Sequence, residues 1–294
     1  MGRAYMRVLV LGGTGSIGSA IVRELLAAGH HVLGLARSAN SARILSEQGV
    51  SIVSGDIRDP SAWSGIITEV DGVIHAAATF SQDMDEIDKE LVCALIDAAK
   101  HASAPPRFIY TGGCWLYGET GDSVATEDTP FHPIGPFASA IDSGTMITAT
   151  PYLEGMIVHP AMVYERDGGV FGRFAEEAKS GVQIGMVGSA QTRWPLVHKD
   201  DLAVLYRLVL EKGLRGSSYN GATEHGVRVG DIVEAISARF KLPSRPLIRS
   251  VEEAVAEYGD WAAGFALDQQ MSGQKARAEL GWTPKHTDSL LLLA

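Results

Sequence analysis

The stretch Val8-Leu-Val-Leu-Gly-Gly-Thr-Gly-Ser-Ile-Gly18 decides the fold of this chain. Its apolar beginning predicts a buried strand that ends at Leu11. Three glycines follow at a regular spacing, at positions 12, 15 and 18, and the residues after them carry an apolar face at helical intervals. A strand, a glycine turn and a helix in this order are typical of dinucleotide-binding folds. There the turn and the free N–H groups at the start of the helix meet a diphosphate.

Each glycine of the turn has its own reason to lack a side chain. The first permits the tight turn, the second lets the backbone approach a diphosphate, and the third lets the helix pack against the strand. A glycine turn with a purely structural role is the alternative. The residues expected to contact the cofactor in this loop are Gly12, Thr14, Gly15, Ser16, Ile17 and Gly18.

The rest of the first half alternates strands with helices, which predicts a parallel sheet. Beyond about residue 165 helices dominate, which suggests a smaller lobe. The fold class is therefore α/β: a doubly wound parallel Rossmann sheet with a small C-terminal substrate lobe. The dinucleotide-binding domain is expected over 1–165, joined by about 196–222, and the lobe over 166–195 and 223–294. Strands are predicted at 7–11, 31–36, 50–54, 72–76, 107–111 and 156–159, and helices at 84–101, 170–179, 200–212, 229–239 and 250–258.

Composition excludes several classes of protein. The 294 residues are 46% apolar, enough for a core, and carry a formal net charge of −10. A general nucleic-acid or membrane-surface binder needs a cationic face, so neither is expected. No apolar run has the length of a membrane span, no signal peptide is visible, and two cysteines make no disulfide framework. A cytoplasmic protein is expected, and the scattered histidines predict no metal site.

The end of the second strand indicates which cofactor is preferred. An acidic residue there would bind the 2′-hydroxyl of NAD, but this chain has Arg37 and Ser38. A guanidinium suits a 2′-phosphate, so NADP (NADPH) is predicted as the preferred cofactor, with NAD as the other option. A solvated surface arginine is the alternative for Arg37. Asn40 and Arg43 could add contacts to the phosphate. Residues expected at the adenine and beside the fourth strand are Asp56, Ile57, Ala76, Ala77 and Ala78.

Several further motifs, in this order along the chain, resemble the short-chain dehydrogenase/reductase superfamily. The similarity is to its extended branch of NAD-dependent epimerases and dehydratases, and it runs over nearly the whole chain. It implies that Pro160, Met162 and Val163 wall the nicotinamide, and that His198 and Asp201 belong to a structural corner. The motifs are Gly55-Asp56-Ile57, His75-Ala76-Ala77-Ala78, Leu116-Tyr117-Gly118, His159-Pro-Ala-Met-Val-Tyr164, Trp194-Pro-Leu-Val-His-Lys-Asp-Asp-Leu-Ala203 and Glu279-Leu-Gly-Trp-Thr-Pro284.

The sequence departs from that family at the residues that carry its chemistry. The family uses a Ser or Thr, a proton-exchanging Tyr and, four residues later, a Lys that lowers the tyrosine pKa. Here these positions hold Gly113, Phe137 and Ile141, and the sequence contains no Tyr-x-x-x-Lys. Phe cannot donate a proton and Ile cannot carry a charge. Either another group supplies the acid, or the standard reaction is absent.

Four residues are the first candidates for the missing acid: Thr111, Cys114, Tyr117 and His132. Tyr152 and His159, at the borders of the strand predicted at 156–159, are further candidates. Thr111 is also expected to touch the cofactor. Tyr117 could equally be a packing residue, and His132 could be a merely exposed loop histidine. Trp115 stands where a small residue is usual, and it would narrow the site or stack on a planar substrate. Other apolar residues expected around the cleft are Phe131, Phe137, Met146, Met162, Phe171 and Trp194.

Three functions remain open. The first is an NADPH-dependent reductase of an apolar carbonyl, enone or imine. The second is a non-catalytic NADP-binding sensor or regulatory protein. The third is a sugar-nucleotide epimerase or dehydratase with relocated catalytic groups, in which Arg166, Arg173 and Arg193 are available for a diphosphate. The resemblance also implies a homodimer through helices at 84–101 and 137–148, although the second helix is a poor helix former and a monomer remains open.

Overall fold

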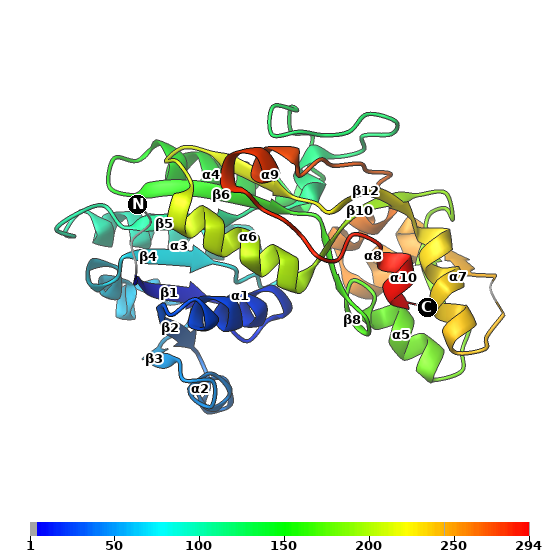
Figure 1. Cartoon of the computed structure of the whole chain (residues 1–294), viewed down its shortest axis with the longest axis horizontal. Helices are drawn as coiled ribbons and strands as arrows, with labels where there is room; N and C mark the ends of the chain where they lie inside the picture. The colour runs from blue at the N-terminus through cyan, green and yellow to red at the C-terminus, as the bar shows by residue number, and fades with distance from the viewer. Residues whose placement is uncertain (1–4, 244, 294) are drawn as a thin grey trace. The chain divides into compact units, whose positions relative to one another are not determined.

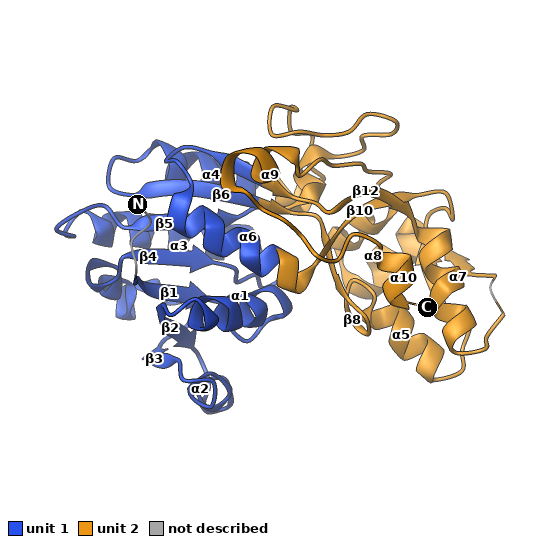
Figure 2. Cartoon of the chain, viewed as in Figure 1, with its two compact units in different colours: residues 1–112, 139–158, 202–219 blue, residues 113–138, 159–201, 220–294 orange. Residues whose placement is uncertain are grey.

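In the computed structural model of the protein, the described residues are 5–243 and 245–293 (Figure 1). They divide into two units, each built from several segments of the chain (Figure 2). Unit 1 holds the chain up to Gly112 together with Ser139–Val158 and Leu202–Tyr219. Unit 2 holds Gly113–Ala138, His159–Asp201 and the chain from Asn220 onward.

A seven-stranded sheet forms the centre of unit 1. Its strand order is β11-β6-β5-β4-β1-β2-β3, and the ladders from β6 to β3 are all parallel. The doubly wound Rossmann fold that the sequence predicts is confirmed. The strands are β1 Arg7–Leu11, β2 His31–Ala36, β3 Ser51–Ser54, β4 Gly72–His75, β5 Arg107–Thr111, β6 Glu154–Pro160 and β11 Ser218–Gly221.

Helices cover both faces of this sheet, and α1, α3 and α6 each bury an apolar stripe. On one face, Leu91 and Leu95 of α3 pack with Leu9 and Phe108 of the strands. On the other, α1 and α6 lie side by side, joined by an ion pair between Glu24 and Arg207. The helices of the sheet are α1 Ser16–Ala27, α2 Ala39–Ser46, α3 Met84–Ala99, α4 Ser139–Ala149 and α6 Lys199–Lys212.

Unit 2 contains two smaller sheets. One has the order β12-β10-β7-β8, and the other pairs β13 with β9. Its strands are β7 Met162–Glu165, β8 Gly168–Gly169, β9 Gly185–Val187, β10 Arg193–His198, β12 Glu224–Arg228 and β13 Leu247–Arg249. Its helices are α5 Gly172–Lys179, α7 Val229–Arg239, α8 Val251–Tyr258, α9 Gln274–Leu280 and α10 Ser289–Leu293. That one part binds a cofactor and the other a substrate stays a prediction.

Two of the helices beside the seven-stranded sheet differ from the sequence-based expectation. Helix α2 was not predicted, because it has only eight residues and buries only Leu45. The helix expected at 137–148 is a short 3-10 turn, Gly135–Phe137, followed by α4. Pro136 explains this start, since proline fits the first turn of a helix but not its interior. Among the described residues, no helix is long and apolar enough to span a membrane.

Candidate functional site

The glycine loop between β1 and α1 has no room for side chains at two positions. Gly12 has a φ of +83°, and the N–H of Gly15 donates to its carbonyl at 2.9 Å. A Cβ on Gly12 would lie 2.6 Å from the carbonyl oxygen of Ala76, and one on Gly18 would lie 2.1 Å from that of Gly12. Both distances are far below a normal contact. The turn therefore requires glycine at both positions.

The start of α1 is open to an anion. Gly15 is its N-terminal cap, no side chain caps the first N–H groups, and the first turn has no acidic residue. Thr14, Gly15 and Ser16 are exposed, and Ile17 is half-buried. The first N–H groups of a helix lack partners within the helix, and the helix dipole favours negative charge there. The loop thus fits the diphosphate of a dinucleotide.

The end of β2 presents one unpaired cation. Arg37 is exposed and has no hydrogen-bond or ion-pair partner among the described residues. Ser38 is already used: its hydroxyl accepts from the N–H of Ser41 at 3.1 Å and so caps α2. Arg43 donates to Glu47 at 2.6 Å. Arg37 is therefore the arginine at this strand end that has no carboxylate partner among the described residues.

The loop after β3 is held in a fixed shape. A side-chain oxygen of Asp56 accepts from the N–H of Arg58 at 3.0 Å, and its carbonyl accepts from the indole of Trp63 at 2.8 Å. Ile57 packs against the core of unit 1. After β4, Ala76 and Ala77 are half-buried and Ala78 is exposed, so this edge carries only small side chains beside the glycine loop.

The three positions that depart from the family pattern are also clear in the structure. Gly113 has an extended backbone, and a Cβ there would meet no described atom within 4 Å. Phe137 ends the 3-10 turn before α4, and Ile141 lies in the first turns of α4. Phe137 and Ile141 are half-buried. No described atom therefore occupies the place of the family's hydroxyl at Gly113. The apolar side chains of Phe137 and Ile141 stand where the family has its Tyr and Lys.

Three of the four candidate acids are engaged or buried. The hydroxyl of Thr111 shares a 2.7 Å hydrogen bond with that of Tyr206, which lies inside unit 1. Burial raises the pKa of the Cys114 thiol to about 12. Burial likewise raises the pKa of Tyr117, whose hydroxyl donates to Asn220 at 2.8 Å. Cys114 and Tyr117 are thus both protonated at neutral pH and shielded from solvent.

His132 is the exposed member of the four candidates. Its backbone N–H donates to the carbonyl of Leu116 at 2.9 Å. A Cβ on Gly118 would lie 2.3 Å from the carbonyl oxygen of His132, so the two segments run in close contact. The His132 side chain is therefore exposed on a loop whose backbone is fixed.

The residues expected to wall the nicotinamide lie where β6 passes into β7. Pro160 and Met162 are buried and Val163 is half-buried. The expectation that Phe171 and Trp194 line a cleft is wrong. Phe171 packs on Tyr164 and Trp194 stacks on Phe174, and both are buried in unit 2.

The structural corner implied for His198 and Asp201 lies in unit 2. The carboxylate of Asp201 accepts from the backbone N–H groups of Lys285 and His286, at 2.9 and 2.7 Å. The imidazoles of His198 and His286 stack with their centroids 3.7 Å apart. Burial, with a smaller contribution from His286, lowers the pKa of His198. These contacts fasten the chain around residue 285 to the end of β10.

Sequence reasoning missed a buried polar group in unit 1. His75 contacts Asp88 at 2.9 Å, and Tyr110 donates to the same carboxylate at 2.7 Å. Burial alone would raise the pKa of Asp88, but hydrogen bonds from His75, Ser143 and Tyr110 outweigh it and lower that pKa. Burial and this carboxylate raise the pKa of Tyr110. His75 was singled out only as part of the motif His75–Ala78, and neither Asp88 nor Tyr110 lies in a motif that would connect it with His75.

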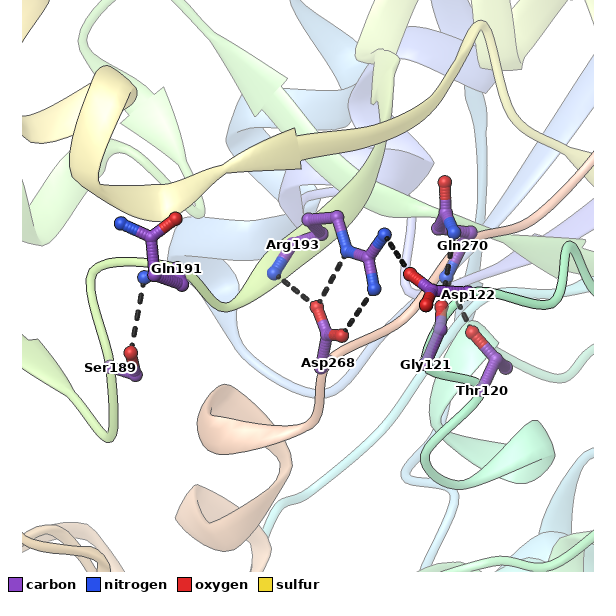
Figure 3. Close-up of polar contacts among 8 residues, drawn as sticks. All are labelled: Thr120, Gly121, Asp122, Ser189, Gln191, Arg193, Asp268 and Gln270. Atoms are coloured by element: carbon purple, nitrogen blue, oxygen red, sulfur yellow. Dashed lines mark hydrogen bonds and ion pairs between the residues drawn. The ribbon is translucent and has the colours of Figure 1, made fainter.

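Two of the three arginine side chains considered for a diphosphate, Arg193 and Arg173 of unit 2, are paired with carboxylates. Arg193 donates to Asp268 at 2.9 and 2.6 Å and to Asp122 at 3.0 Å (Figure 3). Arg173 pairs with Glu177 at 3.1 Å. Arg166 is exposed on the loop after β7. Two of the three arginines that could have bound a diphosphate therefore already have anionic partners.

Aromatic side chains gather around Trp115. Its ring centroid lies 5.3 Å from that of Phe137, 6.3 Å from that of Trp261 and 5.5 Å from that of Phe265. All four are half-buried. Trp261 and Phe265 were not foreseen, because only the fold brings them beside Trp115.

Within the described chain, no group of three or more His, Cys, Asp or Glu side chains is arranged to hold a metal ion.

Comparison with known proteins agrees with the glycine loop. A family model described as the NAD dependent epimerase/dehydratase family matches residues 8–222. An uncharacterized protein of Saccharomyces cerevisiae, YLL056C, is 30% identical over 289 residues, 95% of each chain. The 2'-dehydrokanamycin reductase of Streptomyces kanamyceticus is 26% identical and covers 92% of this chain and 75% of its own. A human epimerase family protein, SDR39U1, solved with NADPH, has a TM-score of 0.79 at 20% identity over 98% of both chains.

Proposed function

Since the chain belongs to the NAD dependent epimerase/dehydratase family, in the extended branch of the short-chain dehydrogenase/reductase superfamily, we propose that it is an NADPH-dependent reductase of an apolar carbonyl, enone or imine. The observation that carries this proposal is an open glycine loop beside an unpaired Arg37 in a chain without the tyrosine–lysine pair. When bound, the nicotinamide supplies a hydride.

The chain's own residues account for cofactor binding. The glycine loop would hold the diphosphate through backbone N–H groups, and Arg37 would hold a 2′-phosphate. Asp56 and Ile57 would meet the adenine, and Pro160, Met162 and Val163 would wall the nicotinamide. An acidic residue in place of Arg37 would repel the phosphate, which is why NADPH is proposed over NADH.

The site chemistry favours a reductase over the standard family reaction. An epimerase or dehydratase must move a proton on and off a sugar oxygen, and losing one such acid commonly costs about 10²–10⁴ in rate. Of the four candidate acids, His132 is exposed, so it is the one proposed to donate a proton where a carbonyl substrate needs one. Arg193 is already paired with Asp122 and Asp268, so it is not available to bind the diphosphate of a sugar nucleotide. The similarity to a protein named 2'-dehydrokanamycin reductase supports reductase chemistry.

A non-catalytic NADP-binding protein is the second candidate. It is favoured by the engaged hydroxyl of Thr111 and the buried Cys114 and Tyr117, since these leave little acid chemistry in the chain. This candidate predicts NADPH binding with no hydride transfer to any substrate.

A homodimer through α3 and α4 remains a prediction, and light scattering after size-exclusion chromatography tests it.

The cofactor proposal is tested by titrating the protein with NADPH and NADH and following nucleotide fluorescence, alongside Arg37→Glu. We expect NADPH to bind more tightly, and the variant to lose about 1.5–3 kcal/mol of that affinity, as for a hydrogen bond to a charged group. NADH binding should change little. Arg215→Glu is the charge-matched control, because Arg215 is exposed and lies just before β11, at the edge of the sheet opposite β2 and β3. Equal binding of both nucleotides, or no binding of either, would contradict the proposal.

A further inference from the structure

Two imidazole rings of unit 2 stack on one another beside a buried carboxylate. The rings of His198 and His286 have centroids 3.7 Å apart and an interplanar angle of 22°. His198, at the end of β10, is buried, and His286 is half-buried. Two positive charges at this separation repel each other strongly where water is largely excluded. The imidazole pair, His198 and His286, therefore tolerates one positive charge better than two.

The hydrogen bonds of the pair indicate which ring accepts that charge. The backbone N–H of Asp200 donates to Nδ1 of His198 at 3.3 Å, so this nitrogen carries no proton in the observed arrangement. Nδ1 of His286 lies 3.0 Å from a carboxylate oxygen of Asp201. Because an ionised carboxylate only accepts, this nitrogen carries a proton. A positive charge is thus compatible with the place of His286, whereas a proton on Nδ1 of His198 would face an N–H group.

The surroundings of His198 disfavour a charge there. The carboxylate of Asp200 lies 3.9 Å from its Nδ1 and would attract a proton. Burial, followed by the charge of His286, nevertheless outweighs this attraction and lowers the pKa of His198. The charged and titratable groups near the ring are Tyr164, Lys199, Asp200, Asp201 and His286, with Glu165 paired to Lys199 and with Glu224 and Asp288 acting on Tyr164.

The imidazole pair lies where the segment 282–293 is attached to the end of β10. The N–H groups of Lys285 and His286 donate to Asp201 at 2.9 and 2.7 Å. Further along, the N–H and hydroxyl of Ser289 donate to Glu224 at 3.0 and 3.2 Å. Helix α10 then packs against α7, and Leu293 is fully buried. Separation of the two rings would remove the first of these attachments.

We propose that the imidazole pair is a pH-sensitive attachment: a second positive charge in the pair separates the rings and releases the segment 282–293 from the end of β10. The direction of the dependence follows from His198. Because the attached state lowers its pKa, attachment is complete above the ordinary histidine pKa, near 6.5, and weakens as the pH falls below it.

Amide hydrogen exchange of the full chain, followed by mass spectrometry between about pH 7.5 and 5, tests this proposal. The N–H groups of Lys285 and His286 report on the attachment directly, because they donate to Asp201. After correction for the exchange of an unfolded peptide, we expect protection of the segment 282–293 to fall by up to about tenfold for each pH unit, since opening takes up one proton. Protection of α7 should not change.

Two variants that keep a ring but remove a charge identify the pair as the cause. In His198→Phe and in His286→Phe a second positive charge cannot form, so protection of the segment should depend much less on pH. His225→Phe is the matched control, because His225 is an exposed histidine of the same unit, and it should behave as the wild type. Melting curves check that each variant folds.

Three results would overturn the proposal. The first is protection of the segment that does not change with pH in the wild type. The second is a pH dependence in both phenylalanine variants equal to that of the wild type. The third is a simultaneous loss of protection in α7, which would mean that the whole unit unfolds and not this segment alone.

Discussion

At the scale of the residue, Gly18 is the position with the least freedom in the glycine loop. In Gly18→Ala the new methyl group would stand 2.1 Å from the carbonyl oxygen of Gly12, so loop and helix must separate. We expect a loss of about 1–3 kcal/mol of stability, typical of overpacking, and a weaker affinity for NADPH. Urea unfolding and nucleotide titration measure the two. Gly65→Ala, which meets no described atom within 4 Å, is the control.

Gly113 and Gly118 differ in the space that a side chain would find: a Cβ on Gly113 would meet no described atom, and one on Gly118 would clash. Gly113→Ser should leave the melting temperature unchanged, because nothing described lies within 4 Å of the new Cβ and its backbone is extended. Gly118→Ala should lower the unfolding free energy by about 1–3 kcal/mol, since its φ is +66° and its Cβ would lie 2.3 Å from the His132 carbonyl oxygen. Similar melting temperatures for the two variants would contradict this description of the 113–118 segment.

At the scale of the element, a half-buried carboxylate adds a polar link between α3 and the sheet. Asp88 joins His75 of β4 and Tyr110 of β5 to the helix. Because the folded state lowers the pKa of Asp88, its stabilisation is complete above the ordinary carboxyl pKa, near 3.9, and is lost as the pH falls through the folded value. Asp88→Asn should cost about 1–3 kcal/mol at neutral pH.

The same substitution should flatten the dependence of stability on pH at the acid end. Urea unfolding at a series of pH values compares the wild type with Asp88→Asn. Asp97→Asn is the control, because Asp97 is an exposed residue of the same helix that pairs only with Lys100. If Asp88→Asn and the wild type lose stability in parallel on acidification, the carboxylate does not hold the helix as described.

Helices and strands with a strong periodicity of apolar residues could be predicted from the sequence. The candidate site could be predicted only in part. The strand before Gly12 and the helix after it follow from an apolar run and an apolar stripe, which are local properties. The contacts of Asp88 with His75 and Tyr110, and the aromatic contacts of Trp115, could not be predicted. Their members come together only through the order of the strands and the folding of unit 2. From sequence alone, a polar residue in a helix, such as Asp88, is expected to face solvent. Only the structure shows that side chains of two strands contact it.

At the scale of the whole molecule, NADPH should raise the stability of the folded chain. A ligand that binds only the folded state at a hundredfold excess over its dissociation constant adds about 2.7 kcal/mol. For a chain of this size we expect the melting temperature to rise by several degrees. Gly18→Ala should abolish most of the rise while NADH gives a smaller one in the wild type. A rise of equal size in Gly18→Ala would place the nucleotide away from the glycine loop.

Both units are assembled from segments that are interrupted by segments of the other. During synthesis, unit 1 cannot receive β11 until Ser218–Gly221 have left the ribosome, long after the glycine loop has emerged. Unit 2 waits longer still, since Asp268 must arrive before Arg193 has its main partner. No single cut in the gene yields either unit as a continuous piece. Exchanging one half of the chain for that of a relative would therefore divide both units at once.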